Sequence, residues 1–188
     1  FKDYTIKQWG VHPSELSASI LKRLPVRFNY DDNYYSRKYQ GIPRHGYSEI
    51  VASILDHPLI NVRLGVEYDE RVADTYDHVF YSGPIDGYYK YKYGRLGYRT
   101  IYFDRKVHPV GDFQGNAVIN YCSLGEKYTR VHEHAHFCPW ENHDKTLVLT
   151  EYSKETEAED TPYYPKRLTG DMEVFAKYEA DANLDTGV

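Results

Sequence analysis

The sequence predicts an α+β protein in which an antiparallel β-sheet is combined with several helices. Three observations lead to this class. Apolar residues recur at helical spacing early in the chain and again near its C-terminus, whereas short runs rich in tyrosine and β-branched residues occupy the middle. The 188 residues are 41% hydrophobic and 27% charged, a balance that supplies enough apolar material for a core.

Three segments show the pattern of an amphipathic helix. Residues 13–24 carry leucine and isoleucine at helical spacing, and residues 47–56 place apolar side chains at i, i+3, i+4, i+7 and i+8 before Pro58 ends the segment. Asp171 is a candidate N-cap for a last helix over residues 171–183.

Alternating patterns predict strands between these helices. Residues 62–68 alternate between apolar and other positions, and residues 78–81 form a shorter apolar run. Further strands are expected where tyrosine-rich and β-branched runs are separated by Gly, Asp and Asn, namely over residues 98–103, 117–121, 128–137 and 145–152.

Bulk features exclude several classes of protein. No stretch approaches the roughly 18 apolar residues of a membrane helix, and the net charge of -5 argues against non-specific nucleic-acid binding. The start of the chain has no signal-peptide pattern, and Cys122 and Cys138 are too few for a disulfide framework. We therefore expect a cytoplasmic protein without membrane insertion and without a nucleic-acid partner.

Tyrosine is unusually frequent, with 21 residues against 7 phenylalanines and 2 tryptophans. A tyrosine ring packs as an apolar group while its hydroxyl binds water or a ligand. Since tyrosine is also enriched in ordinary sheets, we assign about half of these residues to that cause.

Two clusters permit alternative interpretations. His132, His134 and His136 would share one face of a strand, where imidazoles can bind zinc, or they form a polar face without metal. No second half of a ligand set is recognisable, so we expect no metal. Residues 88–99 interleave cations with aromatic residues, which suits either stacking on nucleic-acid bases or an edge strand protected by lysine.

The sequence contains no G-x-G-x-x-G motif, no P-loop and no nucleophile elbow. Its scattered arginines and tyrosines are the cations and neutral donors that a diphosphate needs. From the residues alone, a ligand-binding α+β protein with an anionic or aromatic ligand is therefore the furthest prediction.

Seven motifs, in order, resemble the bacterial UDP-galactopyranose mutase family. The first two are Y-T-I-K-Q-W-G and R-L-P-V-R-F-N-Y-D-D-N-Y. The seven cover residues 4–10, 23–34, 39–43, 83–86, 93–99, 128–130 and 163–165. This resemblance implies an isomerase that interconverts UDP-galactopyranose and UDP-galactofuranose on reduced FAD through a flavin N5–sugar adduct. Galactofuranose would then enter bacterial cell-wall and surface polysaccharides, and the enzyme would be a homo-oligomer.

The resemblance also implies how the diphosphate is bound. Arg23 and Arg130 would contact it, and Tyr34 and Tyr164 would donate hydrogen bonds to its oxygens. A departing diphosphate must be held while its bond breaks, which is why fixed cations and hydroxyls matter in such a site.

The remaining implied substrate-binding residues surround the nucleoside and the sugar. Tyr4 would pack on uracil with Thr5 and Asn120 as polar neighbours, and Trp9 would lie near the sugar and the flavin. Arg99 is the weakest candidate for the substrate cleft. The resemblance identifies no proven catalytic residue and no FAD-binding residue within this sequence.

The family's glycine-rich FAD fingerprint is absent from the sequence, so we interpret the chain as an internal part of a multidomain flavoenzyme. The expected parts are a helical substrate-binding portion (1–59), strands returning to the FAD-binding domain (60–86), the sheet domain (87–170) and the start of a C-terminal helix (171–188). This piece alone is expected to be inactive and not to bind FAD. The alternative is a non-catalytic nucleotide-sugar binding module.

Overall fold

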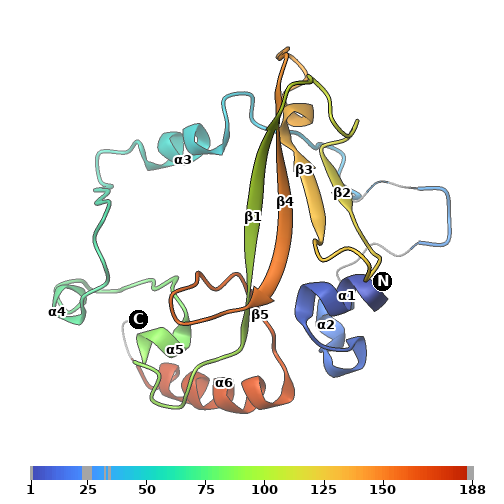
Figure 1. The fold of residues 1–188 in the computed structure, drawn as a ribbon. Coiled ribbons are helices and arrows are strands. Elements are labelled where there is room, and N and C mark those ends of the chain that lie inside the picture. Colours follow the sequence, from blue (N-terminus) through green and yellow to red (C-terminus); the bar gives the residue numbers. More distant parts are fainter. Residues whose placement is uncertain (1, 23–26, 32, 34, 186–188) are drawn as a thin grey trace.

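The structure is a computed structural model and describes residues 2–22, 27–31, 33 and 35–185. A five-stranded sheet with the order β2-β3-β4-β1-β5 forms its centre, and all neighbouring strands in it are antiparallel (Figure 1). The strands are β1 (Tyr98–His108), β2 (Val118–Asn120), β3 (Arg130–Glu133), β4 (Thr146–Glu155) and β5 (Tyr164–Pro165). The predicted α+β class is confirmed.

The helices α1, α2, α5 and α6 lie near the end of the sheet that holds β5, whereas α3 and α4 stand away from it (Figure 1). In this group α1 packs against β4, and α5 packs against α6. The α-helices are α1 (Lys2–Trp9), α2 (Ala18–Lys22), α3 (Tyr47–Leu55), α4 (Glu70–Ala73), α5 (Ile85–Tyr88) and α6 (Thr169–Ala182). Two short 3-10 helices, η1 (Pro13–Glu15) and η2 (His134–Phe137), complete the elements. Among the described residues, no helix is both long enough and apolar enough to cross a membrane.

The strand register brings one row of side chains together across the sheet. Phe103 of β1 lies opposite Glu151 of β4, which in turn lies opposite Arg130 of β3. Asn120 of β2 lies opposite Arg130 on its other side. Directly opposed residues project from the same face of a sheet, so this register places an acid, an arginine and an amide side by side.

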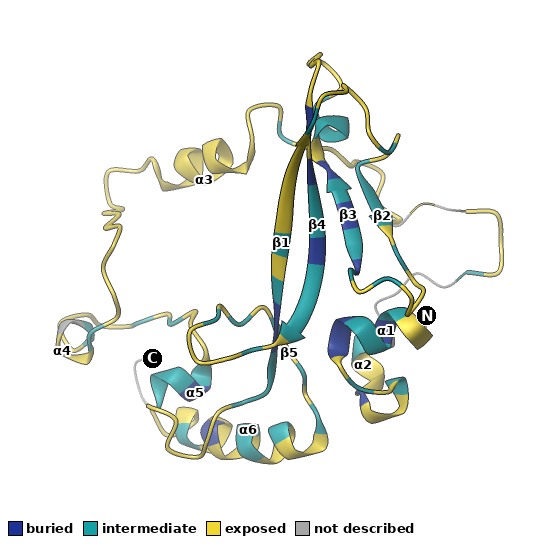
Figure 2. Cartoon of the chain, in the orientation of Figure 1, coloured by how far each residue is buried: buried dark blue, intermediate teal, exposed yellow. Residues whose placement is uncertain are grey.

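Burial is concentrated in the sheet, α1 and α6, whereas α3, α4 and the segments around them are exposed (Figure 2). The buried apolar side chains are Trp9, Leu16, Val131, Val148 and Tyr178. Several polar side chains are equally buried, among them Glu133 and Glu151. Buried polar groups need hydrogen-bond partners, and these contacts determine the site described below.

The helix predictions hold in part. The expected helix over 47–56 is confirmed as α3, and the last helix is confirmed as α6. Asp171 is not its N-cap, because it lies in the first turn, where its carboxylate accepts hydrogen bonds from the backbone N–H groups of Leu168 (3.0 Å) and Gly97 (2.9 Å). The expected helix over 13–24 is instead divided into η1 and α2, with its last two positions outside the described residues.

The segments 62–68 and 78–81, which were predicted to be strands, do not form strands within this chain. Leu64 is 89% exposed and Phe80 is 92% exposed. A strand exists only when its backbone pairs with another strand, and the described part of the chain provides no partner for these two segments. The strand predicted over 128–137 is shorter than expected, since β3 ends at Glu133 and η2 follows.

The cation-rich segment 88–99 is a turn that leads into β1 and not an edge strand. Its cations already have partners: Lys92 pairs with Asp181 of α6, and the Arg95 guanidinium lies 3.9 Å from the centroid of the Tyr91 ring. The buried Tyr178 of α6 donates its hydroxyl to the backbone carbonyl of Gly94 at 2.8 Å. These contacts make the segment an anchor for α6.

Candidate functional site

Arg130 is the centre of the polar row across the sheet. Its Nε donates to Oδ1 of Asn120 at 3.1 Å, and its Nη1 donates to both carboxylate oxygens of Glu151 at 3.1 Å. These bonds engage Nε and Nη1 and fix the plane of the guanidinium, while the side chain remains 28% exposed. The result is a fixed cation that a ligand can still reach.

Glu151 is the buried counter-ion of this cation, with only 1% of the residue exposed. Besides Arg130, its carboxylate accepts a hydrogen bond from Oγ1 of Thr129 at 2.9 Å. The Nε2 atom of His132 lies 3.0 Å from its second oxygen. Three different side chains therefore satisfy one carboxylate, which is the condition for burying such a charge without a large penalty.

Tyr4 of α1 lies against the same arginine. The Arg130 guanidinium carbon is 5.8 Å from the centroid of the Tyr4 ring. The Tyr4 hydroxyl is buried, yet no described residue forms a hydrogen bond of ordinary geometry with it. Burial raises the pKa of Tyr4, and the nearby Arg130 charge only partly opposes this, so the phenol is neutral at pH 7 and can donate.

Tyr164 and Trp9 extend the cluster. Their ring centroids lie 6.0 Å apart in an edge-on arrangement. Burial lowers the pKa of Arg130, but its interactions with Tyr4, Glu151 and Tyr164 outweigh burial and raise the pKa overall. The arginine is therefore permanently charged, and Tyr164 belongs to its surroundings.

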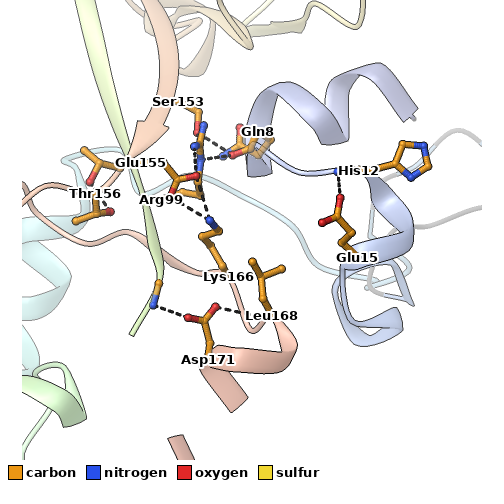
Figure 3. A network of polar contacts seen from close by, with 12 residues as sticks. Gln8, His12, Glu15, Arg99, Ser153, Glu155, Thr156, Lys166, Leu168 and Asp171 are labelled. Carbon is orange, nitrogen blue, oxygen red and sulfur yellow. Dashed lines mark hydrogen bonds and ion pairs between the residues drawn. The ribbon is translucent and has the colours of Figure 1, made fainter. Parts of the chain in front are cut away.

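Arg99 occupies a different, more enclosed position. Its Nε donates to the Gln8 carbonyl at 3.0 Å and to the Ser153 hydroxyl at 3.2 Å, and its Nη1 donates to Glu155 at 2.8 Å (Figure 3). The side chain thereby ties the C-terminal end of α1 to β1 and β4. This geometry favours an anchoring role over the substrate contact that the resemblance implies for Arg99.

Gly10 permits this anchor. It follows α1 with a φ of 73°, and a Cβ at this position would lie 2.7 Å from Nη1 of Arg99. Glycine is the residue that adopts such a φ without strain and leaves room for the guanidinium. The glycine that closes the Y-T-I-K-Q-W-G motif thus has a structural explanation.

The structure brings most of the expected site residues together. Tyr4, Trp9, Asn120, Arg130 and Tyr164 belong to one neighbourhood, and Thr5 is buried in the same helix. The two remaining expectations, Arg23 and Tyr34, lie outside the described residues.

Three residues that form or support the site around Arg130 were not predicted from the sequence. They are Glu151, its neighbour His132, and Lys7. The Lys7 ammonium donates to the backbone carbonyls of Glu126 (3.1 Å) and Tyr128 (2.8 Å), which ties α1 to the turn before β3. Lys7 stands inside the first motif, so its position there was an available signal. Nothing in the local sequence distinguishes Glu151 from the other acids of residues 151–160.

The histidine cluster does not form one strand face. His132 faces Glu151, whereas His136 lies on η2, where its Nε2 is 3.2 Å from Asp112 and 3.4 Å from Glu133. Asp112, Glu133 and His136 hold their potential ligand atoms within 4.8 Å of one another.

Hydrogen bonds explain that second group without a metal ion. Glu133 accepts from the backbone N–H groups of Phe113 (2.9 Å) and Gln114 (2.8 Å), and Asp112 accepts from that of Gly115 (2.7 Å). The carboxylates thus hold the loop over residues 112–115 against β3. The absence of a metal stays a prediction.

Known proteins with similar sequences identify the family of the chain. A family model described as UDP-galactopyranose mutase matches residues 1–188. The chain is 53% identical over its full length to a probable UDP-galactopyranose mutase of Klebsiella pneumoniae, of which it covers 49%. It is 44% identical to a dTDP-fucopyranose mutase of Escherichia coli, with all of this chain and 52% of that protein covered.

A more distant relative is the UDP-galactopyranose mutase of Mycoplasma pneumoniae, which is 28% identical over 96% of this chain and 49% of its own length. The chain spans about half the length of the curated relatives it matches. Because the family model covers every residue, the chain belongs to the UDP-galactopyranose mutase family.

Proposed function

We propose that this chain is part of a mutase that interconverts UDP-galactopyranose and UDP-galactofuranose, and that the cluster around Arg130 receives the diphosphate. One observation carries the proposal: a fixed, partly exposed arginine stands beside the buried Tyr4 hydroxyl, which forms no hydrogen bond of ordinary geometry with a described residue. Buried donors without partners are rare, and an acceptor oxygen from a ligand would complete this one.

The reaction explains why such donors are needed. A nucleoside diphosphate that leaves and is recaptured carries negative charge on oxygens that must be stabilised where it departs. Arg130 would supply charge-assisted hydrogen bonds to these oxygens. Because burial raises the pKa of Tyr4, its hydroxyl would donate without becoming a phenolate that repels the phosphates.

The remaining contacts are proposed from the resemblance. The face of the Tyr4 ring would pack on the uracil while the hydroxyl at the end of the ring donates to the diphosphate. Thr5 and Asn120 would be polar neighbours of the uracil, and Trp9 would lie near the sugar. Arg23 and Tyr34 would add a cation and a donor to the diphosphate, as Tyr164 would from β5. The edge-on contact between Trp9 and Tyr164 supports a common aromatic wall for this ligand.

The cofactor of the whole protein is proposed to be reduced FAD, which when bound supplies the electron-rich nitrogen that the sugar carbon requires. The residues of this chain suit a diphosphate, since they offer cations and neutral hydroxyls. They do not include the glycine-rich turn that cradles a dinucleotide. We therefore propose that FAD is held by other parts of a cytoplasmic homo-oligomer and that this piece alone is inactive.

The test of the reaction uses the full-length protein with dithionite-reduced FAD and follows the conversion of UDP-galactofuranose by chromatography. Turnover is expected in the full-length protein and not in the 188-residue piece. The E. coli relative named a dTDP-fucopyranose mutase makes dTDP-fucopyranose the competing substrate to assay. UDP binding by the full-length protein without turnover of either sugar would favour the non-catalytic module.

The test of the site is the change Arg130→Ala in the full-length protein. Loss of a charge-assisted contact costs about 1.5 to 3 kcal/mol, so UDP affinity measured by titration calorimetry should fall by about tenfold or more. Arg71→Ala is the matched control, because Arg71 is also paired with a carboxylate but lies on α4. Arg71→Ala should bind UDP like the parent. If Arg130→Ala does so too, the diphosphate assignment is wrong.

A further inference from the structure

The buried Glu151 carboxylate presents a problem for an anion site. It lies 3.1 Å from Nη1 of Arg130, whose guanidinium is proposed to meet the diphosphate. A negative charge this close to the phosphates repels them through a weakly screening interior. If charge alone decided ligand affinity, a neutral residue at position 151 would be better for binding.

The geometry of the row suggests what outweighs this repulsion. Asn120 and Glu151 flank Arg130 from the two neighbouring strands and engage different nitrogens of one planar group. Glu151 is itself held by the Thr129 hydroxyl at 2.9 Å, and the Nε2 of His132 lies 3.0 Å away. A planar guanidinium bound on two sides presents its remaining donors in one direction only.

We propose, on the basis of the proposed function, that Glu151 is a positioning residue that orients the Arg130 guanidinium for the diphosphate. Its contribution is made entirely through Arg130 and not through contact with the substrate. If the Arg130 guanidinium is already oriented before the ligand binds, less side-chain entropy is lost on binding. In this way the buried Glu151 carboxylate can improve the binding of a diphosphate although both are negatively charged.

Two explanations of Glu151 therefore predict opposite signs. As a positioning residue, it makes binding of UDP tighter, so Glu151→Gln should weaken UDP binding about tenfold. As a charge that merely neutralises Arg130 in the fold, it opposes the ligand, so Glu151→Gln should leave UDP affinity unchanged or improve it. Glutamine has nearly the same shape and keeps one acceptor oxygen, while its other oxygen is replaced by a donating NH2 group, so the change removes the charge with little loss of volume.

The experiment is a double-mutant cycle in the full-length protein with its cofactor, using UDP as the probe and titration calorimetry as the readout. The variants are Arg130→Ala, Glu151→Gln and both together. If Glu151 acts through Arg130, the double variant should bind UDP no more weakly than Arg130→Ala alone. Additive losses would overturn the proposal, because a general structural defect would weaken binding with or without the arginine.

A second variant and a control complete the design. Glu151→Asp retains the charge but withdraws it by one methylene, so it should also weaken UDP binding, and thermal melting shows whether the variant is folded at the temperature of the titration. Unchanged affinity in a folded Glu151→Asp variant would overturn the proposal even if Glu151→Gln fails to fold. Glu157→Gln removes the same charge from an exposed turn and should bind UDP like the parent.

The outcomes separate this inference from the proposed function. If Arg130→Ala does not weaken UDP binding, the diphosphate assignment fails and the positioning role fails with it. If Arg130→Ala weakens binding but Glu151→Gln does not, the diphosphate assignment stands and only the positioning role is rejected.

Discussion

At the scale of single residues, Tyr4 offers the sharpest test of the site, since its buried hydroxyl forms no hydrogen bond of ordinary geometry with a described residue. In Tyr4→Phe this hydroxyl is removed while the ring is kept. A buried polar group without a partner costs stability, so the melting temperature should be equal to or above that of the parent. UDP affinity should fall by about twofold to about thirteenfold, which corresponds to the loss of one hydrogen bond worth about 0.5 to 1.5 kcal/mol.

Calorimetric melting and UDP titration of the same Tyr4→Phe sample decide this prediction, because the two changes have opposite signs. A lower melting temperature would mean that the hydroxyl is bonded within the protein. Unchanged UDP affinity would remove Tyr4 from the set of diphosphate donors.

At the scale of elements, α1 carries Tyr4 and Trp9, and its C-terminal end is fixed by Arg99. Gly10→Ala should disturb this contact in two ways. Alanine is strained at a φ of 73°, and its Cβ would lie only 2.7 Å from Nη1 of Arg99. The φ alone costs roughly 1 kcal/mol, and displacement of the arginine adds to it. Denaturant unfolding measures the total.

Gly65→Ala is the matched control for that change, since Gly65 has a φ of 67° but no atom within 4 Å of the position that a Cβ would occupy. Gly10→Ala should destabilise the protein more than Gly65→Ala, and only the former should weaken UDP binding. Equal losses of stability would show that Arg99 moves aside freely and is no anchor.

The junction of β3 and η2 should be sensitive to acid. Burial raises the pKa of Glu133, but hydrogen bonds from the backbone N–H groups of Phe113 and Gln114 outweigh it, so the pKa lies below the usual value. A carboxylate with a depressed pKa in the folded state stabilises the protein above its unfolded pKa. This stabilisation is lost as the pH falls through the folded value, below about 4.

Glu133→Gln should therefore lower the free energy of unfolding by about 1 to 3 kcal/mol at pH 7 and by much less at about pH 3. Urea unfolding at the two pH values measures the difference. A loss that is the same at both pH values would mean that the ionised form of Glu133 makes no special contribution.

A helix pattern can be read within one segment, whereas a strand pattern also needs a partner strand. The strands expected over 98–103, 117–121 and 145–152 form as β1, β2 and β4, but an equally clear pattern elsewhere does not. The spacing within residues 47–56 is complete in itself, and α3 forms where it was expected. Residues 62–68 alternate just as clearly, yet they remain unpaired because alternation does not supply a partner strand. The candidate site also depends on strand pairing, because only the register of β3 against β4 places Glu151 beside Arg130.

At the scale of the whole molecule, apolar side chains are distributed unevenly. The segment from α3 to Phe80 leaves large apolar groups exposed, among them Ile54 at 68%, Leu64 at 89% and Phe80 at 92%. The core lies elsewhere, where buried apolar side chains come from β3, β4, α1 and α6 (Figure 2). Exposed apolar surface of this extent is typical of an interface, and the proposed return of residues 60–86 to a FAD-binding domain would cover part of it.

Hydrogen exchange followed by mass spectrometry tests whether residues 60–86 become covered in the full-length protein, by comparing that protein with the 188-residue piece. Backbone amides of β1 and β4 should exchange slowly in both, because each strand is paired from Arg99 opposite Glu155 to His108 opposite Thr146. Amides of residues 60–86 outside the short helices should exchange rapidly in the piece and at least about tenfold more slowly in the full-length protein, since strand pairing there would protect them. Equal, rapid exchange of residues 60–86 in both proteins would show that the rest of the polypeptide does not pair with them. In that case the alternating pattern of residues 62–68 would have no structural role in this family.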